Sequence, residues 1–345
     1  MFHLVSILIV SKERPDELRR TLQRLRGQTY PAMEFLIIDD GSTPTLERIV
    51  RTEAPEATYT YFEQSEGQSK RRSEGFEKAR GSFILQLDDD SFPVDPEALL
   101  KAVRFMEAHS EIGALSLQIF NGEHLPIDLP VLPSKYHSSF VGCGVFFRSE
   151  ALRRIGGYRD FFGNEWEEEE LGLRLMKDGW KIYFWPDVLI HHQLSPRNRL
   201  TERTWMRGFR NKLWAIVMHF PARRLFLEIA WVLAIAAMDA VRLLRFRSFV
   251  GGIMQFLGGI PRALRLRDPM SNIVLRRYDA MRFGVLKTEE EYNNPPQLGL
   301  KDFTIWFRNW LNRPRQRSFW DRRAGDTGSS ATVKYAHEYK SGRRG

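Results

Sequence analysis

The chain has 345 residues, of which 43% are hydrophobic and 28% charged, and its 52 Lys and Arg residues outnumber its 43 Asp and Glu residues. This composition excludes a wholly disordered chain, and the length predicts one large domain with appendages or two domains. The single cysteine, Cys143, excludes an internal disulfide and a zinc cluster held by several thiolates, so we expect a reducing, cytoplasmic setting. The first ten residues lack the basic start of a secretory signal and instead predict a strand.

The first 195 residues alternate short apolar runs with helical patterns. We expect strands at 4–10, 35–38, 58–62 and 83–87, and helices at 16–26, 45–52, 70–80 and 96–109. Continuous apolar strands separated by helices predict an α/β fold in which a mostly parallel sheet is covered on both faces. Ligands bind beyond the carboxyl ends of such strands, so we look for functional residues directly after each strand.

The charge changes sign along the chain. Residues 1–196 carry 23 Lys and Arg against 31 Asp and Glu, whereas residues 197–345 carry 29 against 12. We therefore divide the chain into a first domain at 1–196, an amphipathic helical extension at 197–320 and a basic, disordered tail at 321–345.

Within the extension, apolar positions beside arginines over 205–217 predict an amphipathic helix. Residues 225–244 approach the length that spans a bilayer, but Glu228, Asp239 and Arg242 fall on one stripe. That pattern favours a helix that lies in an interface or packs on the protein. Four glycines between 251 and 259, followed by Pro261, predict a break in the next apolar stretch.

Two acidic clusters follow expected strands. Asp39 and Asp40 can accept hydrogen bonds from a base or a sugar, although an Asp-Gly-Ser sequence is also ordinary turn chemistry. Asp88, Asp89 and Asp90 repel one another unless a cation neutralises them, and their hard oxygen atoms suit Mg²⁺ or Mn²⁺. The second cluster therefore predicts a divalent metal site.

A third acidic cluster, Glu167 to Glu170, follows Trp166 at the start of an expected helix. Acidic residues favour a helix N-terminus, but four in a row exceed what capping requires. A glutamate held near an acceptor hydroxyl can act as a general base.

Taken in order, these segments make residues 3–195 similar to the family 2 glycosyltransferases. The matching segments are 5–10, 28–31, 35–42, 87–93, 142–148, 155–158, 167–174 and Pro186 with His191 and His192. The resemblance implies the GT-A nucleotide-diphospho-sugar transferase fold, here with a basic helical extension. It also implies that Asp40, with Asp39 beside it, contacts the nucleotide base and that Arg71 or Arg72 lies near the base or diphosphate.

The resemblance further implies that Asp88 and Asp90 form the DxD motif, with Asp90 the direct metal ligand and Asp89 part of the nucleotide-sugar site. His192, rather than the adjacent His191, matches the histidine that approaches the metal or diphosphate. For the catalytic base, the resemblance indicates Glu168, with Glu167 as the near alternative.

The implied activity is a metal-dependent, inverting transfer of a sugar from a UDP- or dTDP-linked donor to a hydroxyl of a glycan or lipid-linked acceptor. The implied role is envelope or extracellular polysaccharide synthesis at the inner face of the cell membrane. A nucleotidyltransferase that releases pyrophosphate and a non-catalytic sugar-nucleotide-binding scaffold remain as alternatives. A dinucleotide-binding oxidoreductase is excluded because Gly142 and Gly144 are followed by Phe147, where the motif needs a third glycine. A P-loop NTPase is excluded because the sequence lacks the Gly-Lys-Ser/Thr motif after a glycine-rich loop.

The clustering of basic residues with Trp and Phe after residue 197 favours an anionic partner over a plain solvated surface. We expect peripheral docking on an anionic membrane; the alternative is that residues 205–244 cap the first domain and support an oligomer. A nucleic-acid-binding module would leave the acidic clusters unexplained, so we expect no nucleic acid partner.

Overall fold

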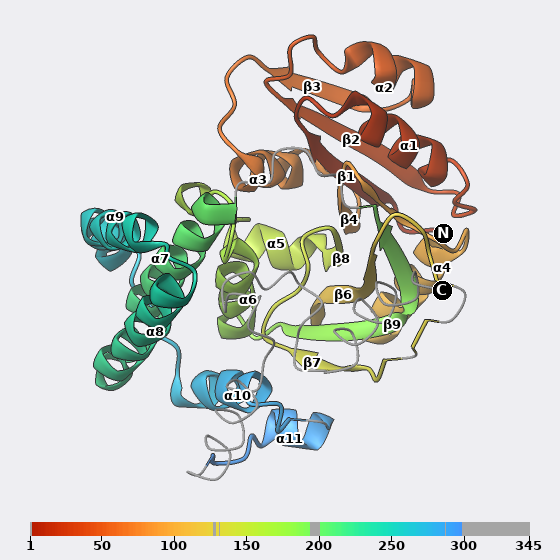
Figure 1. The fold of residues 1–345 in the computed structure, drawn as a ribbon. Coiled ribbons are helices and arrows are strands. Elements are labelled where there is room, and N and C mark those ends of the chain that lie inside the picture. Colours follow the sequence, from red (N-terminus) through yellow and green to blue (C-terminus); the bar gives the residue numbers. More distant parts are fainter. Residues whose placement is uncertain (1, 127–128, 131, 194–200, 287, 299–345) are drawn as a thin grey trace, which may run out of the picture.

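The computed structural model describes residues 2–126, 129–130, 132–193, 201–286 and 288–298. Within these residues nine strands form one sheet in the order β3-β2-β1-β4-β8-β6-β9-β5, and β7 pairs separately with β9 (Figure 1). The strands are β1 (Val5–Ser11), β2 (Met33–Asp40), β3 (Thr58–Phe62), β4 (Phe83–Asp88), β5 (Ser91–Pro93), β6 (Ile112–Asn121), β7 (Lys135–His137), β8 (Gly144–Arg148) and β9 (Lys181–His192). The expected disordered tail at 321–345 lies outside the described residues.

The sheet is parallel from β3 through β2 and β1 to β4, as the sequence predicts. β8 runs antiparallel to β4 and β6, while β6 and β9 are parallel, so the sheet as a whole is mixed. Two consecutive strands that run parallel need a long crossover connection, usually a helix. No helix lies between β6 and β8 in the described residues, which is consistent with their antiparallel pairing. The expected strands and helices of the first 109 residues are confirmed, with their ends displaced by no more than two residues.

Helices cover both faces of the sheet. They are α1 (Pro15–Leu25), α2 (Glu47–Glu53), α3 (Gln68–Lys78), α4 (Ala98–Ala108), α5 (Ser149–Ile155), the 3-10 turn η1 (Asp160–Phe162), α6 (Glu167–Lys177), α7 (Thr201–His219), α8 (Ala222–Arg242), α9 (Phe246–Arg265), α10 (Asn272–Arg282) and α11 (Glu289–Asn293). Because neighbouring strand residues point to opposite faces, Ile7 and Ile9 of β1 pack in the core under α1, α2 and α4. Leu8 and Val10 pack in a second core, which α3, α5, α6 and the helices after residue 200 complete.

The acidic segments meet at one edge of the sheet. Val10 of β1 pairs with both Ile38 of β2 and Asp88 of β4, so these three parallel strands end side by side. β9 runs antiparallel to β5 and places His192 opposite Ser91, just beyond the aspartates. This topology brings segments from four parts of the sequence to a common edge.

The helices after residue 200 pack on the first domain. Figure 1 places α7, α8 and α9 beside α6, on the side away from the sheet. Trp205, Phe209 and Leu213 of α7 are fully buried in the core shared with α6. The amphipathic helix expected over 205–217 is therefore confirmed, and its apolar face contacts protein.

The expected break after residue 250 is wrong, because α9 is continuous and Pro261 lies inside it. The glycines serve close packing instead. A Cβ at Gly252 would collide with the ring of Phe209, and a Cβ at Gly259 with the indole of Trp214. The bare backbone of α9 therefore lies directly against α7.

The residues of the expected polar stripe of α8 lie on one side of the helix but differ in burial. Glu228 and Asp239 are buried, and Glu228 pairs with Arg224 at 2.7 Å and with Arg282 at 3.0 Å, whereas Arg242 is exposed. The polar face of α8 is thus turned toward the protein. None of the helices in the described ranges is both long and apolar enough to cross a membrane.

Candidate active site

The three aspartates occupy the end of β4 and the turn that follows it, and each has a cationic partner. Asp88 Oδ1 accepts from Arg72 Nη2 at 2.6 Å. Asp89 Oδ1 lies 2.5 Å from Arg14 Nη1, and Asp90 Oδ2 also pairs with Arg14. Burial raises the pKa of Asp89 to about 8, although Arg14 opposes the shift. The carboxylates are therefore gathered tightly enough that their charges need neutralisation.

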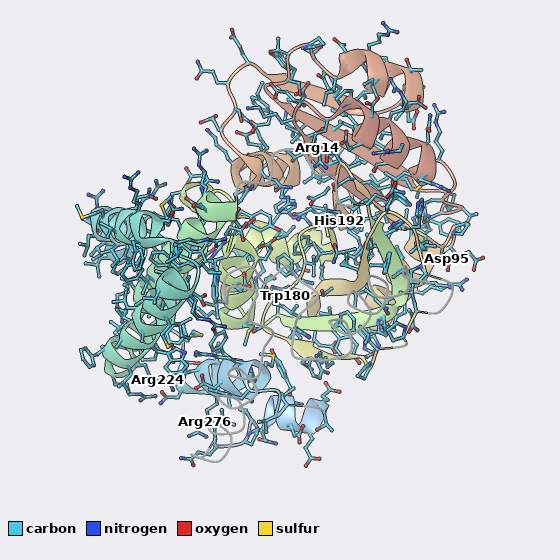
Figure 2. The ribbon with its side chains drawn as sticks, viewed as in Figure 1. Arg14, Asp95, Trp180, His192, Arg224 and Arg276 are labelled. Carbon is cyan, nitrogen blue, oxygen red and sulfur yellow. The ribbon has the colours of Figure 1, made fainter. Side chains whose placement is uncertain are left out.

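His192 completes this cluster from the end of β9. Its Nε2 lies 3.0 Å from Asp90 Oδ1 and 4.0 Å from Asp88 Oδ2, and its Nδ1 lies 2.8 Å from Asn121 Oδ1. An imidazolium donates from both nitrogens, which matches these acceptors. Burial lowers the pKa of His192, but Cys143 and Asp90 outweigh burial and raise it to about 11. Figure 2 shows Arg14 and His192 at this same edge of the sheet.

The donor atoms at this edge suit a divalent cation. Ligand atoms of Asp88, Cys143 and His192 lie within 4.8 Å of one another, and Asp90 Oδ1 is adjacent to His192. Carboxylate oxygen and imidazole nitrogen are ligands that Mn²⁺ accepts, and the carboxylates alone suit Mg²⁺. The described residues therefore contain a possible metal-binding group, Asp88, Cys143 and His192. The sequence predicts Asp88 and His192 but not Cys143, and the role of Asp90 as the direct metal ligand stays a prediction.

Arg72 of α3 lies between the aspartates and the glutamates. Its Nη2 also lies 3.4 Å from the carbonyl oxygen of Gly142. A Cβ placed on Gly142 would lie 2.8 Å from Arg72 Nη1 and 2.6 Å from Glu168 Oε1, so the guanidinium and this carboxylate flank one point. Burial lowers the pKa of Arg72, but Asp88 and the nearby Tyr158 and Glu168 raise it overall, so this side chain stays charged. Arg72 thus joins the two acidic clusters into one site.

Glu167 and Glu168 open α6, and their carboxyl groups interact with one another. Burial raises the pKa of Glu167 well above its usual range, and the neighbouring Glu168 adds to this shift. Burial also raises the pKa of Glu168, against the opposing charge of Arg72. The two neighbouring carboxyls are therefore hard to ionise at the same time.

The backbone before these glutamates is held by α7. Glu165 and Trp166 have φ of 78° and 67°, in the left-handed region that few side chains favour. Asn211 Nδ2 donates to the carbonyl oxygens of Phe162 at 2.9 Å and Glu165 at 2.6 Å. Packing from the C-terminal helices therefore holds a strained turn directly before the paired carboxyls.

Glu170 has a different role from the glutamates that precede it. Its carboxylate accepts from Arg174 Nη2 at 2.8 Å and lies 3.0 Å from His219 Nε2 of α7 and 3.7 Å from Arg159. Burial would raise the pKa of Glu170, but Arg174 and His219 outweigh it and lower the pKa to about 2. This side chain is an anchor between α6 and α7.

Asp39 and Asp40 hold the loops beyond β2. Asp39 accepts from the Ser42 and Leu46 amides, each at 2.9 Å, and from the Tyr59 hydroxyl at 2.7 Å. Asp40 binds the turn that leads into α3, as described next. The carboxylate of Asp39 therefore shapes the loop, and its contact with a nucleotide base stays a prediction.

Asp40 accepts from Arg71 Nε at 2.7 Å and from the amides of Glu66 and Gly67, each at 3.0 Å. Arg71 also stacks over Phe62, with its guanidinium carbon 3.6 Å from the ring centroid. Arg71 is thus committed to Asp40, whereas Arg72, the neighbouring alternative, points to the aspartate cluster. Contacts of Asp40 and Arg71 with a donor stay predictions.

His191 lies on the opposite side of β9 from His192. Its Nε2 is 2.8 Å from the Gly122 carbonyl oxygen, and its ring packs edge-on against Phe92. Neighbouring residues of a strand alternate between faces, which explains why only one of the two histidines reaches the aspartates.

Sequence reasoning missed several residues that contact the site, among them Arg14, Gln68, Asn121, Cys143 and Asn211. Arg14 lies between β1 and α1, at the kind of position where functional residues were sought, so its place in the sequence carried a signal. Gln68 donates to Asp88 Oδ1 at 2.7 Å and begins α3. Nothing in the local pattern around Asn211 distinguishes it from the polar positions of an amphipathic helix.

Residues 6–131 match the family model described as glycosyl transferase family 2. The amylovoran biosynthesis glycosyltransferase AmsE of Erwinia amylovora is 26% identical over 199 residues, which are 54% of this chain and 74% of that protein. The O-antigen biosynthesis protein RfbC of Myxococcus xanthus is 25% identical over 224 residues, which are 56% of this chain but only 18% of that protein.

Two solved structures share the fold. S. aureus TarS 1-349 in complex with UDP-GlcNAc has a TM-score of 0.56 and 14% identity, covering 84% of this chain and 89% of that chain. The mannosyltransferase PcManGT from Pyrobaculum calidifontis, in complex with GDP-Man and Mn²⁺, has a TM-score of 0.52 and 16% identity, covering 77% and 85%. The chain has the GT-A fold of these transferases, as the sequence resemblance implies.

Proposed function

This chain belongs to glycosyltransferase family 2, and we propose that it moves a sugar from a nucleotide-diphosphate donor to a hydroxyl of a glycan or lipid-linked acceptor, with inversion at the anomeric carbon. The observation that carries this proposal is the position of Arg72, which contacts Asp88 on one side and flanks Glu168 on the other. A donor diphosphate would then lie beside the aspartates and an acceptor beside the glutamates, with the buried guanidinium of Arg72 between them.

Asp88, Asp90 and His192 would hold a divalent cation, Mg²⁺ or Mn²⁺, together with the donor. When bound, the cation neutralises negative charge that develops on the departing diphosphate. Arg14 pairs with the carboxylates of Asp89 and Asp90 and would release Asp90 as the ligand enters. Arg72 keeps its positive charge and would lie beside the diphosphate.

Glu168 would act as the general base. The acceptor hydroxyl would transfer its proton to the Glu168 carboxylate while its oxygen forms a bond to the anomeric carbon. The bond from that carbon to the diphosphate oxygen would break at the same time, and the nucleoside diphosphate would leave with the bonding pair. The raised pKa of Glu168 supports this role, because a carboxylate with a higher pKa is a stronger base near neutral pH. Glu167, whose carboxyl interacts with that of Glu168, is the near alternative for this role.

Asp39, Asp40 and Arg71 would shape the base-binding side of the donor site through the loops that they hold. We favour a UDP- or dTDP-linked donor, and an acceptor that belongs to an envelope or extracellular polysaccharide made at the inner face of the cell membrane. Relatives named for amylovoran and O-antigen biosynthesis support this class of acceptor.

Identification of the released product tests the proposal. The full chain, incubated with Mn²⁺ and UDP-, dTDP- or GDP-sugars, should release a nucleoside diphosphate. Release of pyrophosphate from a sugar phosphate and a nucleoside triphosphate would instead identify a nucleotidyltransferase. Thermal stabilisation by a nucleoside diphosphate with neither transfer nor hydrolysis would identify a non-catalytic scaffold.

A further inference from the structure

The outer side of α8 presents apolar side chains to solvent. Phe226, Leu227, Met238 and Val241 are between 41% and 80% exposed, and Ala230 and Ala234 between them are also exposed. At 100° per residue these positions occupy about a third of the helix circumference. The charged Glu228 and Asp239 face the protein on the other side. A helix in contact with water alone would have the reverse arrangement.

The outer side of α9 continues this surface, because α8 and α9 contact one another. Phe246, Val250 and Met254 follow one another at intervals of four residues, and Leu257 and Leu264 fall on the same stripe; all five are between 51% and 64% exposed. Leu244, in the connection between the two helices, is 79% exposed. The α8–α9 outer face, as we call these side chains, consists of the exposed apolar stripes of two helices that contact one another.

The exposed charged side chains of α8 and α9 themselves are all of one sign. They are Arg223, Arg242, Arg247, Arg262 and Arg265, and within these two helices no acidic side chain is exposed. Arg247 and Arg265 are about five helical turns apart and therefore lie along the same edge of α9. Apolar side chains bordered by arginines match the acyl chains and anionic headgroups of a lipid surface.

We propose that the α8–α9 outer face docks on an anionic membrane, with both helices lying in the plane of the interface. Two features favour lipid over other occupants. A second copy of this chain, bound symmetrically through the same face, would oppose the arginines of α8 and α9 to one another, and neither helix has an exposed acidic side chain to neutralise them. A nucleic acid would match the arginines but leave the apolar side chains without a partner.

The docked face is joined to the turn before the paired glutamates. Arg262 of α9 pairs with Asp160 of η1 at 2.9 Å. Asn211 of α7, which packs between α9 and α6, holds the carbonyl oxygens of Phe162 and Glu165. Docking therefore places the acceptor side of the proposed site at a fixed position relative to the membrane. Membrane binding itself does not depend on the proposed reaction.

Flotation of the full chain with vesicles tests the proposal. We expect the chain to float with vesicles of phosphatidylcholine and phosphatidylglycerol, to float less as salt is raised, and to float poorly with phosphatidylcholine alone. Reversing Arg247 and Arg265 to Glu should lower vesicle partitioning by at least about 25-fold, because each arginine contributes about a factor of five at an anionic surface. The matched control reverses Arg48 and Arg153, which are exposed elsewhere on the protein.

A second pair of variants tests the apolar contribution. Met254→Asp with Leu257→Asp should abolish flotation, whereas Val94→Asp, at a residue that is 40% exposed on the first domain, should leave it unchanged. Thermal melting of each variant shows whether it folds. Unchanged flotation of the folded α9 variants overturns the proposal, as does failure of the wild-type chain to float. A dimer that these variants dissociate, without vesicle binding, would show that a second copy covers the face.

Discussion

His219 Nε2 of α7 lies 3.0 Å from Glu170 Oε1 of α6, and this contact ties the C-terminal helices to the helix that begins with the paired glutamates. Glu170 is fully buried, and Arg174 fills its other side. The fourth carboxyl of the acidic run, Glu170, is therefore not interchangeable with the first two. This division of labour leads to the first two predictions.

The first prediction concerns acid stability. The pKa of Glu170 falls from 4.5 to about 2 in the folded chain, so its carboxylate stabilises the fold above about pH 4.5 and this contribution is lost as the pH falls toward 2. This shift corresponds to a contribution of Glu170 to the free energy of unfolding on the order of 3 kcal/mol. We expect Glu170→Gln to lower the Tm at neutral pH and to reduce the dependence of Tm on pH between 4.5 and 2. Glu150→Gln, on the exposed side of α5, should behave as wild type; an identical pH profile for the Glu170 variant would refute the assignment.

The second prediction concerns the catalytic base. We expect Glu168→Gln to lower the transfer rate by about 10²- to 10⁴-fold while donor binding is retained, because an amide cannot accept the acceptor proton. Glu169→Gln, one position along the same helix, is the matched control and should retain activity. Donor binding is measured by thermal shift with a nucleoside diphosphate and Mn²⁺, and transfer by product release. Normal turnover by the Glu168 variant, or loss of transfer in the control, would sink this role.

The third prediction concerns Arg14. Because its guanidinium pairs with both Asp89 and Asp90, Arg14→Gln leaves buried carboxylates with less positive charge beside them, and breaking such a pair costs about 3–5 kcal/mol. We expect a lower Tm without divalent cations and a larger rise in Tm when Mn²⁺ is added than for wild type. Arg48→Gln on α2 is the control. Equal responses to Mn²⁺ in the variant and wild type would argue against a cation site at these carboxylates.

The fourth prediction concerns the strained turn before α6. Asn211→Ala removes the donor that holds the Phe162 and Glu165 carbonyl oxygens. We expect the transfer rate to fall by up to about 10²-fold, since a small displacement of a catalytic group has an effect of that size. Thermal stabilisation by donor nucleotide should be unchanged, because the aspartate edge is held by other elements. Equal losses of donor binding and transfer would indicate a general folding defect instead.

The parallel direction of β1 to β4 could be predicted because continuous apolar strands alternate with helical patterns. In the structure, the pairing of β1 with both β2 and β4 brings the Asp39–Asp40 and Asp88–Asp90 segments to one edge. The mixed part of the sheet, around β8, could not be predicted. β8 pairs with β4 on one side and β6 on the other through contacts that a local sequence pattern does not encode. Strand periodicity alone did not separate His191 from His192, since either could have faced the aspartates. Only the register with β5 settles the choice.

The glycines of α9 show a different limit. A glycine lowers helix propensity, and the same absence of a side chain permits close helix packing. Which effect dominates depends on the partner, and Phe209 and Trp214 come from a helix more than forty positions earlier. The run of four glutamates poses the same problem, because the partners that separate Glu170 from Glu168 are Arg174, His219 and Arg72, two of them distant in the sequence.

Gly142 has no side chain, and the Arg72 guanidinium and the Glu168 carboxylate both lie against the place that a Cβ would occupy. Even an alanine there would insert a methyl group within 2.6 Å of Glu168 Oε1 and within 2.8 Å of Arg72 Nη1. One methyl group would thus force the guanidinium of Arg72 or the carboxylate of Glu168 to move away from its present position. The absence of a side chain at position 142 therefore permits these two groups to approach the same point of the backbone.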